Sequence, residues 1–238
     1  MNEQDVFQMY MKIFNAPEVK SICSKCREKA NLSRPISLWQ LGRDFGTSEY
    51  KVLFVGKTAR GIPCKSLPVD DIFHDATKRA DELFVGRYHY WSYTNAICKS
   101  LYGDDAWEKI AFTNLVKCNA SDDIDKTDYE TKENCIIRNK IFLNELIIIN
   151  PSTIIFYTGY DYNEFLKELF KEYNLVNVAY TSKPVGAKNL PWWEFTITIN
   201  SKIIRCLRVG HPERKKKDQF VDLIVNYIKD DSYGLCED

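Results

Sequence analysis

The chain has 238 residues, of which 45% are hydrophobic and 13% aromatic, so it can bury the core of one large domain or two small ones. Basic and acidic residues number 33 each, which excludes a globally basic nucleic-acid-binding protein and leaves only local basic segments for that role. No apolar run can span a bilayer, so we expect no membrane partner and a cytoplasmic location. In that compartment the eight cysteines are expected to be free thiols or metal ligands.

The N-terminal segment combines a helix with a cysteine pair. Residues 6–15 carry apolar side chains at near-helical spacing, and we expect this helix to stop at Pro17. Cys23 and Cys26 form a C-x2-C pair, which can present two thiolates to one metal from a tight turn. Half a metal site is an ambiguous signal, and ordinary thiols explain the pair equally well.

A buried strand and a long connection come next. Residues 51–55 (KVLFV) form a short apolar run that ends at Gly56, which is typical of a buried parallel strand. The connection over residues 57–83 contains two prolines together with Asp70, Asp71 and His74. Loops of this length are usually functional or mobile, so we expect it to face the substrate.

The rest of the chain alternates helices and strands. We expect an aromatic-rich helix over residues 88–102, a strand over 110–116, a helix over 133–149, a strand over 153–158, a helix over 161–173 and a short strand over 176–180. Residues 192–199 and 203–209 flank Asn200-Ser201, the pattern of a hairpin with a tight turn. A helix over 217–229 and a polar tail over 230–238 complete the chain.

This alternation predicts an α/β fold. We expect residues 1–238 to form a single three-layer domain, with a central, mostly parallel four-stranded sheet flanked by helices and an N-terminal segment over residues 1–50. Ligands of such sheets bind outside the carboxyl ends of the strands. Four strand ends carry distinctive residues, namely Gly56-Lys57-Thr58, Asn114, Gly159 and His211. One cleft is therefore expected to hold Asn114, His211 and the Gly56 loop.

The segment around His211 has two interpretations. His211 follows a predicted strand, Pro212 fixes the turn, and residues 214–217 (RKKK) are all basic. A histidine in this setting can act on an anionic substrate. The same pattern also fits a capped turn followed by a solvated start of a helix, and this segment alone leaves both interpretations open.

An ordered series of motifs resembles the uracil-DNA glycosylase superfamily, and within it the iron–sulfur branch called family four. The motifs are Cys23-Ser24-Lys25-Cys26, residues 51–56 (KVLFVG), residues 84–87 (FVGR), residues 113–118 (TNLVKC), Cys135, residues 151–159 (PSTIIFYTG) and His211-Pro212. The series extends from about residue 21 to the final helix, so the resemblance covers most of the chain.

The resemblance implies a monofunctional DNA glycosylase that acts as a monomer. Such an enzyme flips a pyrimidine out of DNA, hydrolyses its N-glycosidic bond and leaves an abasic site, in base-excision repair or in defence against phages. Phe84 would stack on the base, Asn114 would bind its edge, and His211 would donate toward the developing anion. Backbone N–H groups after Gly56 would complete the pocket.

The resemblance also implies a cofactor. Cys23, Cys26, Cys118 and Cys135 would hold a [4Fe–4S] cluster of structural or DNA-positioning role, with structural zinc as the alternative and free thiols as the simplest case. The remaining cysteines, Cys64, Cys98, Cys206 and Cys236, stay outside this set.

The first catalytic motif departs from the family. Residues 56–61 (GKTARG) lack its proline and contain two cations, and no water-activating residue is evident. Asp70, Asp71 or His74 would be the general base. We expect Lys57, Thr58, Asp70 and Asp71 to contact the substrate, and the basic residues Arg60, Arg214, Lys215 and Lys216 to contact DNA phosphates.

The predicted loop between Gly61 and Phe84 is also longer than in the family, Leu83 replaces its proline, and Glu213-Arg214 follows His211-Pro212. These changes predict a pyrimidine bulkier than uracil, such as hydroxymethylated or glucosylated cytosine of phage DNA, with uracil itself as the other candidate. Two further hypotheses stay open at this point: a catalytically inactive DNA-binding relative of the same fold, and an unrelated α/β domain with structural zinc.

Overall fold

Four apolar segments form the parallel centre of the sheet. They are β2 (Val52–Thr58), β3 (Ala111–Val116), β4 (Thr153–Phe156) and β7 (Lys202–Val209), and β2, β3 and β4 are almost entirely buried. The computed structural model describes residues 3–33, 35, 40–58, 84, 89–121 and 124–230. Strands β2, β3 and β4 are covered on both faces of the sheet, which explains why their sequences are continuously apolar.

The register aligns the carboxyl ends of these strands. Gly56 of β2 pairs with Asn114 of β3, and Phe156 of β4 pairs with Arg208 of β7, in the spatial order β3-β2-β4-β7. Gly159, beyond β4, donates from its backbone N to Val209 O, which keeps the two chains paired past the end of β4. The residues that follow each strand therefore emerge at one edge of the sheet.

The α/β class is confirmed, but the expected four-stranded, mostly parallel sheet is wrong. Across the described ranges the sheet has seven strands in the order β1-β3-β2-β4-β7-β6-β5 and is mixed. At one edge, β1 (Gln40–Leu41) is antiparallel to β3; at the other, β6 (Lys188–Ile199) and β5 (Val176–Val185) extend the sheet antiparallel to β7.

Residues 176–180 and 192–199 are expected as strands, but prolines interrupt the pattern between them and hide their extension into one hairpin; the short β1 is not expected at all. Pro184 lies in β5 and Pro191 in β6, and proline disfavours central strands since it cannot donate to the ladder. Here β5 is the edge strand, and Gly186 turns the chain into β6 with a φ of +61°. The expected turn at Asn200-Ser201 is confirmed, with both residues at positive φ between β6 and β7.

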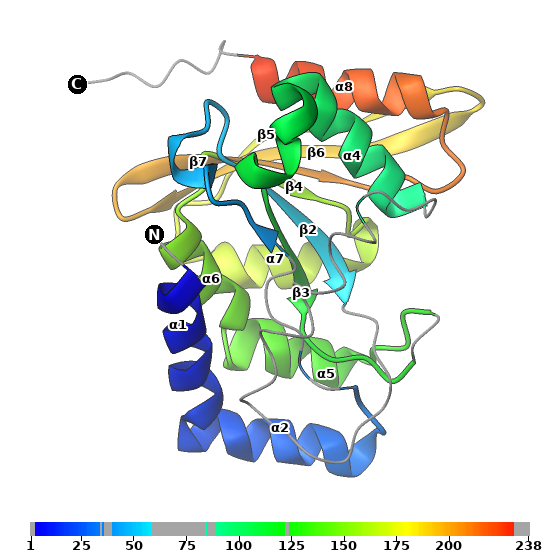
Figure 1. Ribbon diagram of the computed structural model, residues 1–238. Helices are drawn as coiled ribbons and strands as arrows, with labels where there is room; N and C mark the ends of the chain where they lie inside the picture. Colours follow the sequence, from blue (N-terminus) through cyan, green and yellow to red (C-terminus); the bar gives the residue numbers. More distant parts are fainter. Residues whose placement is uncertain are drawn as a thin grey trace.

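Helices cover both faces of the sheet (Figure 1). One face carries α1 (Glu3–Asn15), α6 (Ile141–Ile149) and α7 (Asn163–Phe170); the other carries α4 (His89–Tyr102) and α8 (Lys217–Lys229), with η2 (Gly103–Lys109) after α4. In the view of Figure 1, α2 (Pro17–Lys29) and α5 (Tyr129–Glu133) lie below the sheet. None of the described helices is long and apolar enough to cross a membrane.

Two helix expectations need correction. Pro17 does not merely end the first helix; it opens α2, because proline fits the first turn of a helix, and Cys23 and Cys26 therefore lie on this helix and not in a tight turn. The helix expected over 133–149 is divided at Lys140, whose φ is +48°, into the π-helical turn η3 (Asn134–Arg138) and α6.

A buried ion pair joins β3 to the helices on one face. Lys117, directly after β3, places its Nζ 2.6 Å from Glu145 Oε1, and both side chains are almost fully buried. The same ammonium donates to Thr113 Oγ1 and to the Asn114 carbonyl, each at 2.7 Å. Glu145 also accepts hydrogen bonds from Thr113 Oγ1 and from Tyr10 Oη of α1. These hydrogen bonds satisfy both buried charges.

Replacing Lys117 by methionine is expected to lower the free energy of unfolding by about 3 kcal/mol, because it leaves the Glu145 carboxylate buried without its counterion. Urea denaturation followed by circular dichroism measures the change. Lys167→Met is the control, since its ion pair with Glu164 is solvent-exposed, and we expect it to change stability little. Adding Glu145→Leu to Lys117→Met should restore part of the loss. A single variant as stable as the unmodified protein would contradict this role for Lys117.

Candidate functional site

Four cysteines from three elements line one cavity of about 30 Å³. Cys23 and Cys26 lie one turn apart on α2, Cys118 follows β3, and Cys135 lies on η3. The other lining residues are Phe14, Arg27, Leu32, Val116, Lys117, Thr131, Asn134, Asn139 and Ile141. The structure therefore brings together the four cysteines that the motif series singled out, although they are up to 112 positions apart in the chain.

Each of the four sulfur atoms lies within reach of a nitrogen donor. The pairs are Asn139 Nδ2 with Cys23 (3.7 Å), Asn134 Nδ2 with Cys26 (3.1 Å), Arg27 Nη2 with Cys118 (4.0 Å) and the Lys117 backbone N with Cys135 (3.4 Å). N–H groups directed at sulfur favour the thiolate over the thiol. S–H groups are also directed at backbone carbonyls, that of Cys135 at Leu115 (3.9 Å) and that of Cys206, which lies in the core, at Ile204 (3.8 Å).

Burial opposes ionisation of three of these thiols. It raises the pKa of Cys23 to about 11 and that of Cys135 to about 12, and it raises the pKa of Cys118 well above the usual range. The negative charges that neighbouring cysteines would carry add to the shift, whereas Arg27 lowers the pKa of Cys23 and Cys118. Four thiolates in this cavity therefore need a compensating cation, and a metal centre is one chemical means of supplying it.

The cysteines surround the cavity without converging on one point. Among the residues that the structure describes, no three His, Cys, Asp or Glu side chains approach closely enough to hold a single metal ion. The donor set itself, four sulfur atoms with an N–H group near each, is the set that zinc and iron–sulfur centres use.

A second cluster lies at the carboxyl edge of the sheet. Gly56 and Asn114 face each other in register on β2 and β3. A Cβ on residue 56 would lie 2.1 Å from Asn114 Oδ1 and 2.8 Å from Tyr90 Oη, so only glycine allows both polar groups to pack against β2. The Tyr90 ring stacks on His211, with centroids 5.4 Å apart and planes at 29°. Gly56, Asn114 and His211 therefore meet around Tyr90, as expected from the strand ends.

Tyr90 is the residue of this cluster that sequence reasoning missed. It lies near the start of α4, where it is one of several aromatic residues with nothing to distinguish it. Its ring makes edge contacts with Phe112 and Tyr157, and burial raises its pKa well above the usual value. Its hydroxyl is buried and has no hydrogen-bond partner among the described residues. It therefore provides a neutral O–H donor beside Asn114.

The geometry of His211 fixes its tautomer. Nδ1 accepts a hydrogen bond from the backbone N of Glu213 at 3.1 Å, and the side chain is 36% exposed. Because Nδ1 is the acceptor, the neutral imidazole carries its proton on Nε2. His211 can therefore donate a hydrogen bond from Nε2 without being charged.

The other predicted substrate residues are dispersed. Phe84 is buried in the core, where its ring packs against Trp107 at 4.3 Å, while the ring that stacks on His211 is that of Tyr90. Lys57 pairs with Asp161 at 3.9 Å. Thr58 donates to the Cys118 carbonyl at 2.9 Å and so links the end of β2 to the cysteine cavity. Arg60, Asp70, Asp71 and His74 lie outside the described residues.

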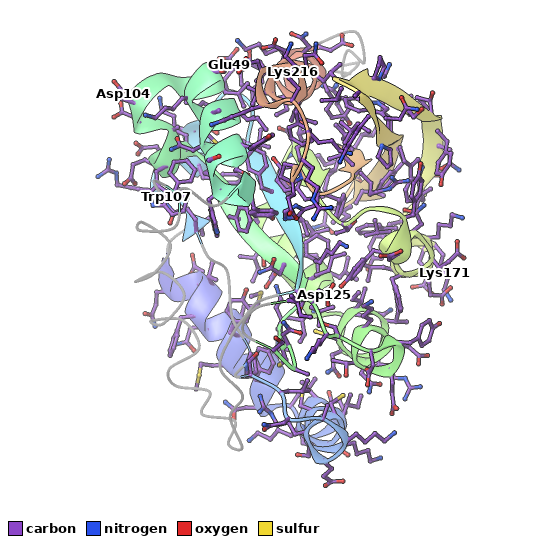
Figure 2. All side chains as sticks on the ribbon, turned by 90° about the vertical axis from the view of Figure 1, so that its right-hand side faces the viewer. Glu49, Asp104, Trp107, Asp125, Lys171 and Lys216 are labelled. Atoms are coloured by element: carbon purple, nitrogen blue, oxygen red, sulfur yellow. The ribbon has the colours of Figure 1, made fainter. Side chains whose placement is uncertain are left out.

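The basic run lies between β7 and α8. Arg214 is 78% exposed and has a φ of +62°. Lys215 accepts a hydrogen bond at its carbonyl from Tyr93 Oη, which anchors the run to α4. Lys216 lies at the start of α8 and is exposed (Figure 2).

No protein-family model matches the chain, and no curated protein matches it. Functional interpretation therefore depends on the residues themselves and on how the fold groups them.

Protein purified without oxygen is expected to contain iron and acid-labile sulfide, with broad absorbance near about 400 nm, if the cavity holds an iron–sulfur cluster. Cys26→Ser and Cys118→Ser should each abolish most of the iron and the absorbance, because each removes a sulfur ligand from the cavity. Cys206→Ser is the control and should retain both signals, since Cys206 lies outside the cavity lining. Metal analysis that finds zinc without iron would replace the cluster by a zinc site.

Proposed function

We propose that this protein is a monofunctional DNA glycosylase that removes a flipped pyrimidine and leaves an abasic site. The observation that carries the proposal is the convergence of Gly56, Asn114 and His211 from three different strand ends on one cluster. These residues belong to the ordered motifs that resemble the uracil-DNA glycosylase superfamily. The positions that the resemblance assigns to one pocket are thus brought together by the fold.

The chemistry of the cluster suits cleavage of a base–sugar bond. Departure of a pyrimidine leaves negative charge on the base, and a preorganised neutral donor stabilises such charge without the cost of desolvating a cation. His211 supplies that donor through Nε2, and the Asn114 amide can pair with the edge of the base. The Tyr90 hydroxyl adds a third polar group to the same pocket. In this proposal Asp70, Asp71 or His74 activates the water.

We assign the four-cysteine cavity to a [4Fe–4S] cluster, with structural zinc as the alternative. Tetrahedral zinc requires its sulfur ligands at roughly 3.8 Å from one another, given a Zn–S distance of about 2.3 Å. A [4Fe–4S] cluster requires a wider spacing of its four sulfur ligands, so the preference for it rests on the motif resemblance, while the four-sulfur donor set fits either group. The bound group would supply a structural link between α2, the end of β3 and η3, because hydrolysis of a glycosidic bond transfers no electrons.

A basic surface beside His211 supports DNA as the substrate. The tip of the β5–β6 hairpin, which carries Lys188, approaches the run 214–217 (RKKK): a Cβ on Gly186 would lie 3.3 Å from Lys216 Cβ, and Gly186 N donates to Gln219 of α8 at 2.6 Å. Partial burial and then the charge of Lys188 lower the pKa of Lys215. Like charges held together in this way are favourable next to a polyanion.

The preferred base is proposed from the sequence alone. A bulkier pyrimidine than uracil, such as hydroxymethylated or glucosylated cytosine, is our first candidate, and the role is then defence against phages; uracil would indicate base-excision repair. We further propose that the protein acts as a monomer in the cytoplasm. A catalytically inactive DNA-binding protein is the second candidate function, favoured by the cations Lys57 and Arg60 in the first motif.

Incubation with single-stranded and duplex oligonucleotides that each contain one test pyrimidine is expected to produce abasic sites at a single base type. His211→Ala and Asn114→Ala should each lower the rate of base release by about 100-fold or more, because each removes a hydrogen bond that is strongest in the transition state. Alkali-induced strand cleavage measures the abasic sites.

The matched control is Asn144→Ala, since the exposed side chain of this asparagine donates to the carbonyl of Lys140 at the start of α6. It should release base at the unmodified rate. Cleavage confined to uracil would exclude the modified-base proposal. Retained DNA binding with no base released from any substrate would establish the inactive relative instead.

Removal of two lysines from the basic surface is expected to weaken DNA binding without changing base preference. Lys188→Gln with Lys215→Gln should reduce the slope of log affinity against log salt by up to about 2, because each phosphate contact contributes about 0.9. Fluorescence anisotropy with labelled duplex DNA between low and moderate salt measures the slope. Lys167→Gln with Lys171→Gln, on α7 and just beyond it, is the control pair and should leave the slope unchanged. Equal slopes for the two double variants would exclude this surface as the DNA contact.

A further inference from the structure

Arg208 of β7 is a fully buried arginine that lacks a hydrogen-bonding partner among the described residues. Its exposed fraction is 0%, and Nε, Nη1 and Nη2 are all buried and make no hydrogen bond to any residue that the structure describes. Burial lowers its pKa, although the nearby hydroxyls of Tyr180 and Tyr160 partly counteract this effect. The Tyr180 hydroxyl is near enough to raise this pKa as a hydrogen-bond partner, although no hydrogen bond to the guanidinium meets the full geometric criteria. A charge in this position is costly to the folded state.

Three aromatic rings surround the guanidinium. Its Cζ lies 4.7 Å from the ring centroid of Tyr160 and 5.6 Å from those of Tyr180 and Trp193. Trp193 is buried, whereas Tyr160 and Tyr180 are 53% and 60% exposed. The charge therefore lies directly beneath two solvent-facing rings whose centroids are 6.5 Å apart. Cation–π attraction offsets part of the cost of burial but satisfies none of the five N–H groups.

A second unsatisfied donor lies at the neighbouring strand end. Arg208 pairs in register with Phe156, and Thr158 follows two positions later, where the two chains are still joined by the Gly159 N to Val209 O bond. Thr158 Oγ1 is buried and has no partner among the described residues. The carboxyl ends of adjacent parallel strands are the usual place for a ligand in α/β folds.

Nearby charge does not compensate Arg208. Asp161, the residue after Tyr160, is 76% exposed and pairs with Lys57 at 3.9 Å. Within the described chain, Arg208 forms no ion pair with a carboxylate. The ligand that would accept hydrogen bonds from Arg208 and balance its charge is therefore an anion.

We propose that Arg208 and Thr158 bind a phosphate group that enters between the rings of Tyr160 and Tyr180. A guanidinium presents a planar fork of N–H donors that matches phosphate oxygens, and threonine adds a hydroxyl donor. Exposed tyrosine rings beside a cation are the combination that binds single-stranded nucleic acid, through stacking on bases and contact with the backbone. The phosphate belongs either to DNA or to a free anion.

The DNA assignment rests on the proposed glycosylase function. Arg208 lies three residues before His211. A DNA strand whose flipped base contacts His211 therefore passes close to the carboxyl end of β7. The phosphate site itself depends only on the guanidinium, the hydroxyl and the two rings.

Arg205 offers a matched control on the same strand. Its guanidinium also lies 4.7 Å from a tyrosine ring, that of Tyr227, but its Nη2 donates to the Tyr227 carbonyl at 2.7 Å. Arg205→Gln therefore removes an arginine anchored by a hydrogen bond to the backbone, although its Nε makes none to the described residues, and Arg208→Gln removes one with no hydrogen bond to any described residue. The two substitutions are chemically identical.

The test measures binding of inorganic phosphate by calorimetry, binding of labelled oligothymidylate by anisotropy, and the melting temperature. Arg208→Gln should weaken phosphate binding at least tenfold while the melting temperature stays equal or rises, because a buried charge has been removed. Arg205→Gln should lower the melting temperature and leave phosphate binding unchanged. A lowered melting temperature with undiminished phosphate binding in Arg208→Gln would show that the arginine is structural and would overturn the proposal.

Arg208→Lys resolves the case in which Arg208→Gln does not fold. It keeps the charge but loses the fork, so phosphate affinity should fall at least threefold; unchanged affinity would overturn the site. Loss of phosphate and oligothymidylate binding together identifies DNA as the source, whereas loss of phosphate binding alone identifies a free anion. Arg208-dependent phosphate binding without any base release supports this site and rejects the glycosylase. Base release together with phosphate binding that does not depend on Arg208 supports the glycosylase and rejects the phosphate site.

Discussion

The ammonium group of Lys117 is the interaction on which both candidate sites depend. Its Nζ binds Glu145, Thr113 and the carbonyl of Asn114, while its own backbone N points at Cys135. Asn114 belongs to the cluster at the sheet edge, and Cys118, one residue after Lys117, lines the cysteine cavity. A buried ion pair with all its hydrogen bonds made tolerates little displacement, so the end of β3 holds the two sites at a fixed separation.

Buried polar groups in this fold fall into two kinds. Lys117 and Glu145 satisfy each other, and such a network contributes rigidity to the chain. Others, including Tyr90 Oη, Thr158 Oγ1 and the Arg208 guanidinium, are buried and have no hydrogen-bond partner in the part of the chain that the structure describes; these three lie at or beside the carboxyl edge of the sheet. Unsatisfied groups cost stability, and proteins retain them mainly where a ligand completes the hydrogen bonds. Their location agrees with a ligand-binding edge that extends from β2 to β7.

The antiparallel extension changes the surface available beside that edge. In Figure 1 the β5–β6 hairpin lies beyond β7, and its tip reaches the segment that leads into α8. This arrangement joins lysines of the hairpin to the basic run after His211, and it places Tyr180 over Arg208. Both features arise from strands that a four-stranded sheet would lack. They give the proposed DNA-binding face a shape and charge that the parallel core alone does not provide.

The sequence by itself determined the class of fold and the identity of the strand ends. Continuous apolar runs such as residues 51–55 and 110–116 specify buried parallel strands. The point where each run ends is visible in the local sequence pattern, so Gly56, Asn114 and His211 could be identified as residues at strand ends. The width of the sheet escaped prediction, since Pro184 and Pro191 mask the hairpin that tertiary pairing with β7 stabilises. Only the tertiary structure placed Phe84 against Trp107, brought Tyr90 to His211 and gathered four cysteines around one cavity. It also left Arg208 unsatisfied beneath two rings, because contacts between residues far apart in the chain depend on the packing of whole layers and leave no local signal.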